Sequence, residues 1–419
     1  MLLRNARLPD GTVRDVLLDG DRVRRTAPPG ELPAGDDALD LSGYLLLPAP
    51  AEPHAHLDKS LTWDVVGAPP GDLPAAIDAW RAHAVGVTEE DVSGRARRAL
   101  DELVLNGVTA VRTHVDLLPG DDPLRGLRAL LRLRDEPAVR RRVEVQIGVL
   151  HAEAPEPLLR EALRMGADVL GGCPHLATDP AAAVEQGLRL ADEFGVRLDL
   201  HADENLDPAS RDLSLLSAAL RSDARNQPKA AAGPGLRGPV VASHCVSLGA
   251  LPEAAAKRLA KEVAAAGVCV VTLPLTNLYL QGRQPAPPGS GDPGSAQRGV
   301  PRGLTALRAL LDAGVTVAAG GDNVRDPFNP VGRFDPLETA SLLVTAGHLT
   351  PDEALRAVTT GAREALGLPP AGPSEGALAD LLAVRADSLS EALGAACPER
   401  VVFRAGRLVA RTRVARELR

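Results

Sequence analysis

The middle of this 419-residue chain alternates short apolar segments with segments whose apolar residues recur at helical spacing, such as 156–165 and 182–194. The apolar segments are Tyr44–Leu47, Val108–Arg112, Val143–Val149, Ala167–Leu170, Arg197–Leu200, Val240–Ala242, Val268–Leu273 and Val315–Ala319. Strands that alternate with helices form parallel sheets, so these eight segments predict an α/β fold, a distorted (β/α)8 TIM barrel. An open, doubly wound sheet is the alternative, although no G-x-G-x-x-G turn follows the early strands.

The two ends of the chain have a different pattern. Residues 1–43 contain short strand-like runs with hairpin signals at Asp10-Gly11 and Asp19-Gly20, and residues 380–409 contain similar runs with a turn at Ala405-Gly406. We therefore expect 1–48 and 366–419 to form one small β-sandwich domain, and 49–365 to form the barrel. Two segments rich in Pro, Gly and Ala, 222–238 and 284–302, are expected to be loops.

Composition excludes several classes of protein. Aromatic residues make up only 2 % of the chain, so the core must come from Leu, Val and Ala. The net charge is −8 and there is no basic stripe with interleaved aromatic residues, so we do not expect nucleic acid as a partner. No apolar run approaches the roughly 20 residues of a membrane span, and the N-terminus does not resemble a signal peptide. We expect a soluble, cytoplasmic protein without membrane contact.

Most of the histidines lie where a barrel places its active site. Six of the nine fall at or just past the end of a predicted strand: His54, His56, His114, His151, His201 and His244. In a barrel these strand ends form one face, where active sites are found. His54 and His56 are two residues apart in extended chain, so both can point at one metal ion. With His201 after the fifth strand and Asp322 after the eighth, they predict a His3Asp site for zinc or iron.

Two further residues indicate what such a site would do. Glu204 lies three residues after His201, where a carboxylate can reach a substrate above the metal and move protons; an ordinary helix-start carboxylate is the alternative. His244 could orient an attacking water, and a hydrogen-bonded core histidine is its alternative. Because a bound divalent ion makes water a nucleophile near neutral pH, the combination predicts hydrolytic chemistry.

At this point the chain resembles the amidohydrolase superfamily, and within it the cytosine-deaminase-like group, over nearly its whole length. The similar segments are 52–58, 111–116, 166–175, 201–204, 242–244, 274–283, 322–327 and 377–381. The resemblance implies that His54, His56, His201 and Asp322 bind the metal, and that Glu204 protonates a ring nitrogen. It also implies that His244 and Asp322 handle the water and its proton.

The resemblance also bears on the number of metal ions and on assembly. Binuclear members often carry a modified lysine after the fourth strand, where this chain has Gly171-Gly172-Cys173-Pro174-His175. We therefore expect one divalent ion, zinc or iron. Members are usually homo-oligomers, and we expect the same here.

Three positions depart from the cytosine deaminases. Ala152 stands where they carry a glutamine that recognises the pyrimidine edge, Asn323 stands where they carry a second aspartate, and Phe328 replaces a tryptophan. The pairs Asp58-Lys59 and Asp322-Asn323 are more similar to the branch that removes alkylamino groups from triazine rings. Cytosine itself is therefore not the expected substrate.

Five residues are predicted to contact the substrate: Lys59, Asn323, Gln281, Phe328 and His151. Lys59 is the only lysine near the site, and its ammonium could bind a carbonyl or an anionic substituent. His151 could replace the missing glutamine, with a structural role as the alternative. For Gln281 and Phe328 the alternative is ordinary loop packing.

The function predicted from the sequence is a metal-dependent hydrolytic deaminase. It would release ammonia or an amine from an amidine-like carbon of a small nitrogen heterocycle, such as a pyrimidine- or triazine-like ring, and its partner would be this small-molecule substrate. Hydrolysis of a cyclic amide or lactam, or of an N-alkylamino group, is the alternative on the same scaffold. A non-catalytic binding protein is a further alternative, which the complete ligand set argues against.

Overall fold

The computed structural model describes residues 1–33, 37–67, 71–226, 235–282, 303–415 and 417–419, with the side chains of 223–226 excepted. All of the predicted loop 284–302, and 227–234 of the predicted loop 222–238, lie outside the described residues.

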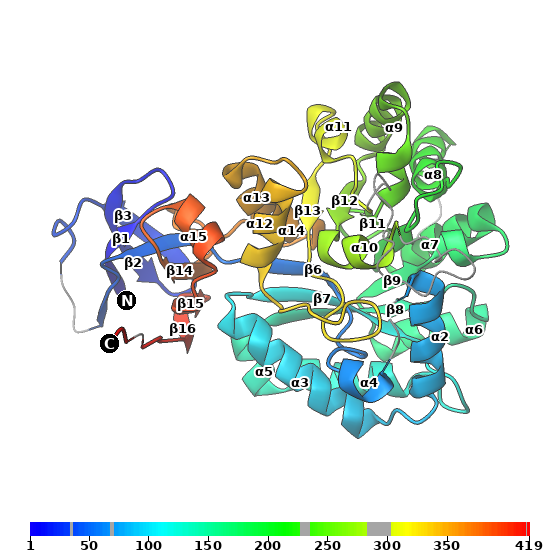
Figure 1. The fold of residues 1–419 in the computed structure, drawn as a ribbon, viewed down its shortest axis with the longest axis horizontal. Helices are drawn as coiled ribbons and strands as arrows, with labels where there is room; N and C mark the ends of the chain where they lie inside the picture. Colours follow the sequence, from blue (N-terminus) through cyan, green and yellow to red (C-terminus); the bar gives the residue numbers. More distant parts are fainter. Residues whose placement is uncertain (34–36, 68–70, 227–234, 283–302, 416) are drawn as a thin grey trace.

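Eight parallel strands form a barrel in which each strand pairs with its neighbours in chain order (Figure 1). They are β6 (Ala51–Ala55), β7 (Ala110–Asp116), β8 (Glu144–Leu150), β9 (Val169–Gly172), β10 (Arg197–Ala202), β11 (Val241–His244), β12 (Cys269–Thr272) and β13 (Val317–Ala319). A parallel bridge between Ala55 and Asp322 joins the first strand to the chain just after the last one. The predicted TIM-like barrel is confirmed.

Helices follow the barrel strands and surround the barrel (Figure 1). They are α1 (Trp63–Val66), α2 (Leu73–Ala84), α3 (Glu89–Leu105), α4 (Arg125–Asp135), α5 (Pro137–Arg142), α6 (Glu156–Met165), α7 (Pro180–Phe194), α8 (Asp212–Asn226), α9 (Glu253–Ala266), α10 (Pro274–Leu280), α11 (Leu307–Asp312), α12 (Pro336–Thr345), α13 (Pro351–Val358) and α14 (Thr360–Ala365). A further helix, α15 (Leu389–Ala395), comes after the last barrel helix and lies beside the small sheet (Figure 1). None of those in the described ranges is long and apolar enough to cross a membrane.

Strands from both chain ends form a second, mixed sheet beside the barrel (Figure 1). Its strands are β1 (Leu2–Arg7), β2 (Val13–Asp19), β3 (Arg22–Ala27), β4 (Ala38–Asp40), β5 (Tyr44–Pro48), β14 (Leu381–Arg385), β15 (Arg400–Arg404) and β16 (Arg407–Arg411). The predicted turns join β1 to β2, β2 to β3, and β15 to β16, which pair as antiparallel hairpins. The small β domain built from both ends is thereby confirmed, while the limits 1–48, 49–365 and 366–419 stay a prediction.

One predicted barrel strand is wrong. Tyr44–Leu47 is part of β5 in the small sheet, where Leu47 pairs with Leu382. The first barrel strand is β6, which carries Glu52 and His54 in its buried interior. A search for apolar segments misses this strand, because its alternate residues Glu52 and His54 are polar while Ala51 and Ala55 pack in the hydrophobic core.

Leu, Val and Ala make up most of the buried side chains between the barrel and its helices, as the composition predicts. The few aromatic residues of this core include Trp80, Phe328 and Phe334. Aliphatic packing therefore supplies most of the apolar burial that stabilises the barrel.

Arg400 of β15 connects the small sheet to the barrel. Its side chain is 1 % exposed, and its guanidinium donates to both carboxylate oxygens of Asp335 at 2.8 and 2.7 Å and to the carbonyl of Asn106 at 2.9 Å. Asp335 begins α12 and Asn106 ends α3. One buried cation thus joins one strand of the small sheet to two helices of the barrel.

We expect Arg400→Met to lower the free energy of unfolding by about 3 kcal/mol, because it leaves a mostly buried carboxylate without its counter-ion. Urea titration followed by circular dichroism measures this change. Arg308→Met is the matched control, since Arg308 contacts Glu353 at 2.9 Å with 53 % of its side chain exposed. Equal unfolding midpoints for the two variants would contradict the structural role of Arg400.

Candidate active site

Three imidazoles meet at the carboxyl ends of the barrel strands. His54 of β6, His56 just after it, and His201 of β10 are all buried. The Nε2 atom of His201 lies 3.1 Å from that of His54 and 3.4 Å from that of His56. Asp322 Oδ1 lies 3.2 Å from His56 Nε2 and 3.8 Å from His54 Nε2. The structure thus brings together the four residues predicted as metal ligands.

The proton on His54 is placed by its neighbours. His54 Nδ1 lies 2.9 Å from Ser243 Oγ, and the Ser243 hydroxyl donates to Asp199 Oδ1 at 2.7 Å. Because serine has a single hydroxyl proton, its oxygen must accept from His54 Nδ1–H. The lone pair of His54 Nε2 therefore points toward His201 and Asp322, the state in which an imidazole binds a metal.

The donor set fits a divalent ion. Burial, together with the neighbouring imidazoles, holds the pKa of His54 and His201 well below the usual value, so both rings are neutral and each has one nitrogen with a free lone pair. Donor atoms about 2.1 Å from a tetrahedral zinc stand roughly 3.4 Å apart, close to the separations seen here. Lone pairs and a carboxylate that converge without a proton repel one another, and a cation between them removes this repulsion. Binding of the metal by these residues stays a prediction.

Glu52, to which the sequence patterns assign no role, holds the first and last strands together. Its buried carboxyl accepts from the backbone N–H groups of His54 at 3.1 Å and Gly321 at 2.9 Å. A Cβ at Gly320 would lie 2.3 Å from Glu52 Oε1, so the chain passes too close for a side chain there. This contact places Asp322 beside His54. The signal available in the sequence was Glu52 itself, a charged residue two positions before His54.

His244 and Glu204 lie beside this cluster. Asn277 Oδ1 is 3.0 Å from His244 Nδ1 and accepts a hydrogen bond from its N–H, which leaves His244 Nε2 as an acceptor. Glu204 Oε1 lies 3.7 Å from His244 Nδ1. Burial raises the pKa of Glu204 to about 8, although His175 acts in the opposite direction. At neutral pH the Glu204 carboxyl is therefore protonated and can donate.

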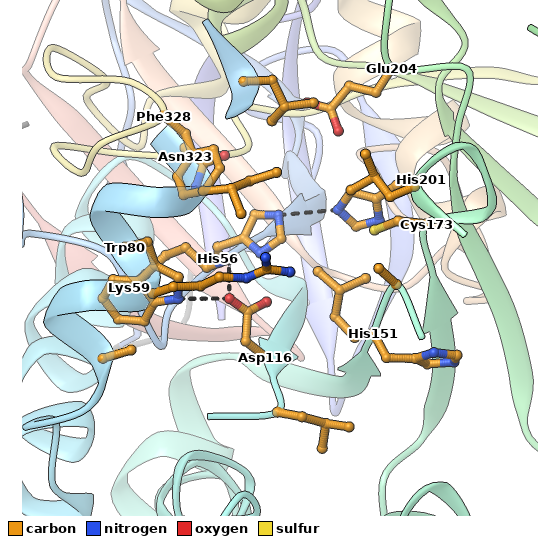
Figure 2. A pocket seen from close by; sticks show the side chains of 18 of the residues that line it. His56, Lys59, Trp80, Asp116, His151, Cys173, His201, Glu204, Asn323 and Phe328 are labelled. Carbon is orange, nitrogen blue, oxygen red and sulfur yellow. Dashed lines mark hydrogen bonds and ion pairs between the residues drawn. The ribbon is translucent and has the colours of Figure 1, made fainter. Parts of the chain in front are cut away.

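A cavity of about 350 Å³ opens beside the imidazoles and extends to α2 (Figure 2). Among the residues predicted to contact substrate, Lys59, Asn323, Phe328 and His151 line it. Gln281 is not among the lining residues; its side chain donates to the Glu204 carbonyl at 3.0 Å. The structure thus places Gln281 behind Glu204, as a residue that positions the backbone there.

Two lining residues escaped the sequence-based prediction, Asp116 and Trp80. Asp116 ends β7 two positions after His114, and Lys59 Nζ donates to its Oδ2 at 2.7 Å. Trp80 of α2 donates to the same oxygen from Nε1 at 2.8 Å. Two signals in the sequence were available. Asp116 lies two positions after His114, a histidine at a strand end, and Trp80 is one of only two tryptophans in the chain.

Fold and site together define the class of protein, a barrel hydrolase with a buried His/Asp cluster suited to a metal ion. The family model described as "Amidohydrolase family" matches residues 81–402. The chain belongs to the amidohydrolase family and is a hydrolase of carbon–nitrogen bonds in nitrogen heterocycles.

Relatives with stated activities agree with this class. The chain is 31 % identical over 411 residues to a pterin deaminase from Rhizobium rhizogenes, covering 96 % of this chain and 87 % of the relative. A 5-methylcytosine deaminase from Klebsiella pneumoniae, solved with 5-fluorocytosine, superposes with a TM-score of 0.84 at 29 % identity, covering 100 % of this chain and 99 % of that one. An N-isopropylammelide isopropylaminohydrolase from Burkholderia multivorans gives 0.79 at 31 % identity, covering 98 % of each chain.

We expect His201→Ala to lower metal affinity by at least about 100-fold, because loss of a ligand exceeds the 10–100-fold cost of losing a residue that only orients one. Elemental analysis after dialysis against a chelator series measures the bound metal. The control is His348→Asn, since His348 is exposed and its φ of 54° is tolerated by Asn. Wild-type metal content in His201→Ala would show that His201 is not a ligand.

Proposed function

We propose that this chain is a deaminase with one divalent ion, zinc or iron, that acts on a small aminated heterocycle of the pterin class. The observation that carries the proposal is the convergence of the His54, His56 and His201 Nε2 atoms near a buried Glu204, whose raised pKa favours the protonated carboxyl. A neutral carboxyl beside a metal-binding cluster supplies the proton that an amidine carbon needs before water attacks it.

The chemistry divides among four groups. His54, His56, His201 and Asp322 would hold a divalent ion, which when bound would make the attacking water nucleophilic near neutral pH. Asp322 takes the proton that the water gives up. Glu204 gives its proton to the ring nitrogen next to the amino-bearing carbon, which makes that carbon electrophilic. His244 accepts a hydrogen bond from the water through Nε2, because Asn277 keeps its proton on Nδ1. Asp322 then passes the proton that it took from the water to the amino group, whose bond to the ring carbon breaks so that it leaves as ammonia. The proton of the hydroxyl added to that carbon returns to Glu204, which leaves a ring carbonyl and restores both carboxyl groups.

The cavity supports a two-ring substrate. Its lining includes His201 and Glu204 and also the aliphatic Leu73 and Ile77 of α2. A volume of about 350 Å³ accommodates a fused heterocycle whose amino end lies at the histidines and whose other ring contacts aliphatic side chains. The pterin deaminase resemblance, which spans most of both chains, supports the same substrate class. Pyrimidines and triazines belong in the same ammonia-release screen, since the relatives of known structure act on these rings.

We expect Glu204→Gln to keep its metal and lose about 10²–10⁴-fold in kcat on the best substrate of the screen, since the amide cannot transfer a proton. Ammonia release and elemental analysis on the same preparation measure both quantities. The control is Glu193→Gln, which removes a half-exposed carboxylate on α7 that pairs with Arg160 on α6.

Two results would count against the proposal. Near-wild-type turnover by Glu204→Gln would rule out its role as proton donor. Absence of ammonia release from every aminated heterocycle by metal-loaded wild-type protein would overturn the deaminase assignment itself.

A further inference from the structure

Lys59 and Asp116 form an ion pair that faces the substrate cavity. Lys59 Nζ lies 2.7 Å from Asp116 Oδ2, and both residues line the cavity. Two aromatic rings lie near the ammonium of the pair: Lys59 Nζ is 5.0 Å from the ring centre of Phe328 and 5.8 Å from that of Trp80. Two charged side chains and two aromatic rings thus lie close together in the lining of the cavity.

Asp116 is held from several directions. Trp80 Nε1 donates to the same Oδ2 at 2.8 Å, and the backbone N–H of Asp116 donates to Asp58 Oδ2 at 3.0 Å. Burial lowers the pKa of Lys59, but the carboxylates of Asp116 and Asp58 outweigh this effect and the pKa stands above its usual value. The geometry of the pair is therefore set before any substrate arrives, which is the condition for specific recognition.

The pair keeps two N–H donors and one acceptor oxygen to offer. An ammonium has three N–H donors, and only the one to Asp116 is used within the described part of the chain. Asp116 Oδ1 accepts no hydrogen bond from any described residue, while Oδ2 takes both Lys59 and Trp80. The side chain of Lys59 is 5 % exposed and that of Asp116 is 22 % exposed. In such a sheltered place an unmatched donor and acceptor discriminate strongly between ligands.

We propose that Lys59 and Asp116 form a subsite for the lactam edge of the substrate ring, in which Lys59 donates to the ring carbonyl and Asp116 Oδ1 accepts from the adjacent ring N–H. This inference rests on the proposed function and names the substrate class more narrowly. A carbonyl beside an N–H presents one acceptor and one donor side by side, which matches the groups left over on the pair.

The charge of the pair does not favour an anionic substituent beside Asp116. Lys59 alone would attract a carboxylate or phosphate, but Asp116 at 2.7 Å offsets its charge, and Arg81 is a separate cation in the lining of the cavity. An anion placed here would meet the carboxylate of Asp116 at close range. A neutral group with both a donor and an acceptor meets no such repulsion.

The subsite and the proton donor contact different edges of the substrate. In Figure 2, Glu204 lies above His56 and His201, whereas Lys59 and Asp116 lie below and to the side of them, with the pair's hydrogen bond drawn as a dashed line. A ring with its amino-bearing carbon at the imidazoles can therefore present one ring nitrogen to Glu204 and the lactam to the pair.

Matched substrates and variants test this subsite. The substrates are pterin and its O-methylated analogue, which keeps the amino group but lacks both the lactam N–H and the carbonyl. We expect metal-loaded wild-type protein to prefer pterin by at least about 100-fold in kcat/KM. Asp116→Asn should lower kcat/KM for pterin by about tenfold or more, chiefly through KM, while the value for the analogue stays within about twofold.

Two further measurements keep the result interpretable. The double variant Lys59→Gln with Asp116→Asn removes both charges of the pair together, so it reports on recognition if the single variant is unstable. Binding of lumazine, the product that retains the lactam, is followed by fluorescence and requires no turnover. The control is Glu253→Gln on α9, where Glu253 pairs with Lys257 at 2.5 Å on the surface.

The outcomes separate this inference from the proposed function. Equal losses for pterin and its analogue, or wild-type protein that uses both equally well, would make the pair structural and overturn the subsite. If wild-type protein releases no ammonia but binds lumazine, and binds it more weakly without Asp116, the subsite holds and the deaminase proposal fails. If lumazine does not bind to wild-type protein, the subsite is wrong.

Discussion

The arrangement of the site depends on one buried ion pair inside the barrel, between Arg112 and Asp199 at 2.7 Å. Burial would raise the pKa of Asp199, but His114 and Arg112 lower it to about 2, so the carboxylate is charged throughout the physiological range. A charged Asp199 requires Ser243 to donate to it, and Ser243 must then accept from His54. The position of the proton on His54, the first of the predicted metal ligands, is thus determined two hydrogen bonds away, by a pair that is fully buried and costly to break.

Two residues of the site have backbone conformations that are unfavourable for residues with a side chain, and contacts with neighbouring strands and loops hold them there. Asp322 and His244 have φ values of 61° and 70°, in the left-handed region that is costly for residues with a Cβ. Asp322 is held there by its own N–H, which donates to the His54 carbonyl at 3.1 Å, and His244 by Thr305, which donates to its carbonyl at 2.6 Å. Strain at these positions turns both side chains toward the cluster, and the surrounding strands hold them in place.

Recognition of the substrate uses the other half of the cavity. Ala152 lines that cavity and offers no side-chain hydrogen bond to a ring. Lys59 and Asp116, which come from the first and second strand ends, supply donors and an acceptor there. Further polar residues of the lining are Arg81, His151 and Asn323.

The sequence by itself determined the alternation of strands and helices, the aliphatic core and the His54, His56, His201 and Asp322 set. These are local properties: periodicity along a segment, and the place of a residue at a strand end. Three features depended on tertiary structure: that β6 and not Tyr44–Leu47 is the first barrel strand, that Gln281 lies behind Glu204, and that Asp116 joins Lys59. Each joins residues far apart in the chain, and spacing along a sequence does not record which side chains meet when a barrel closes.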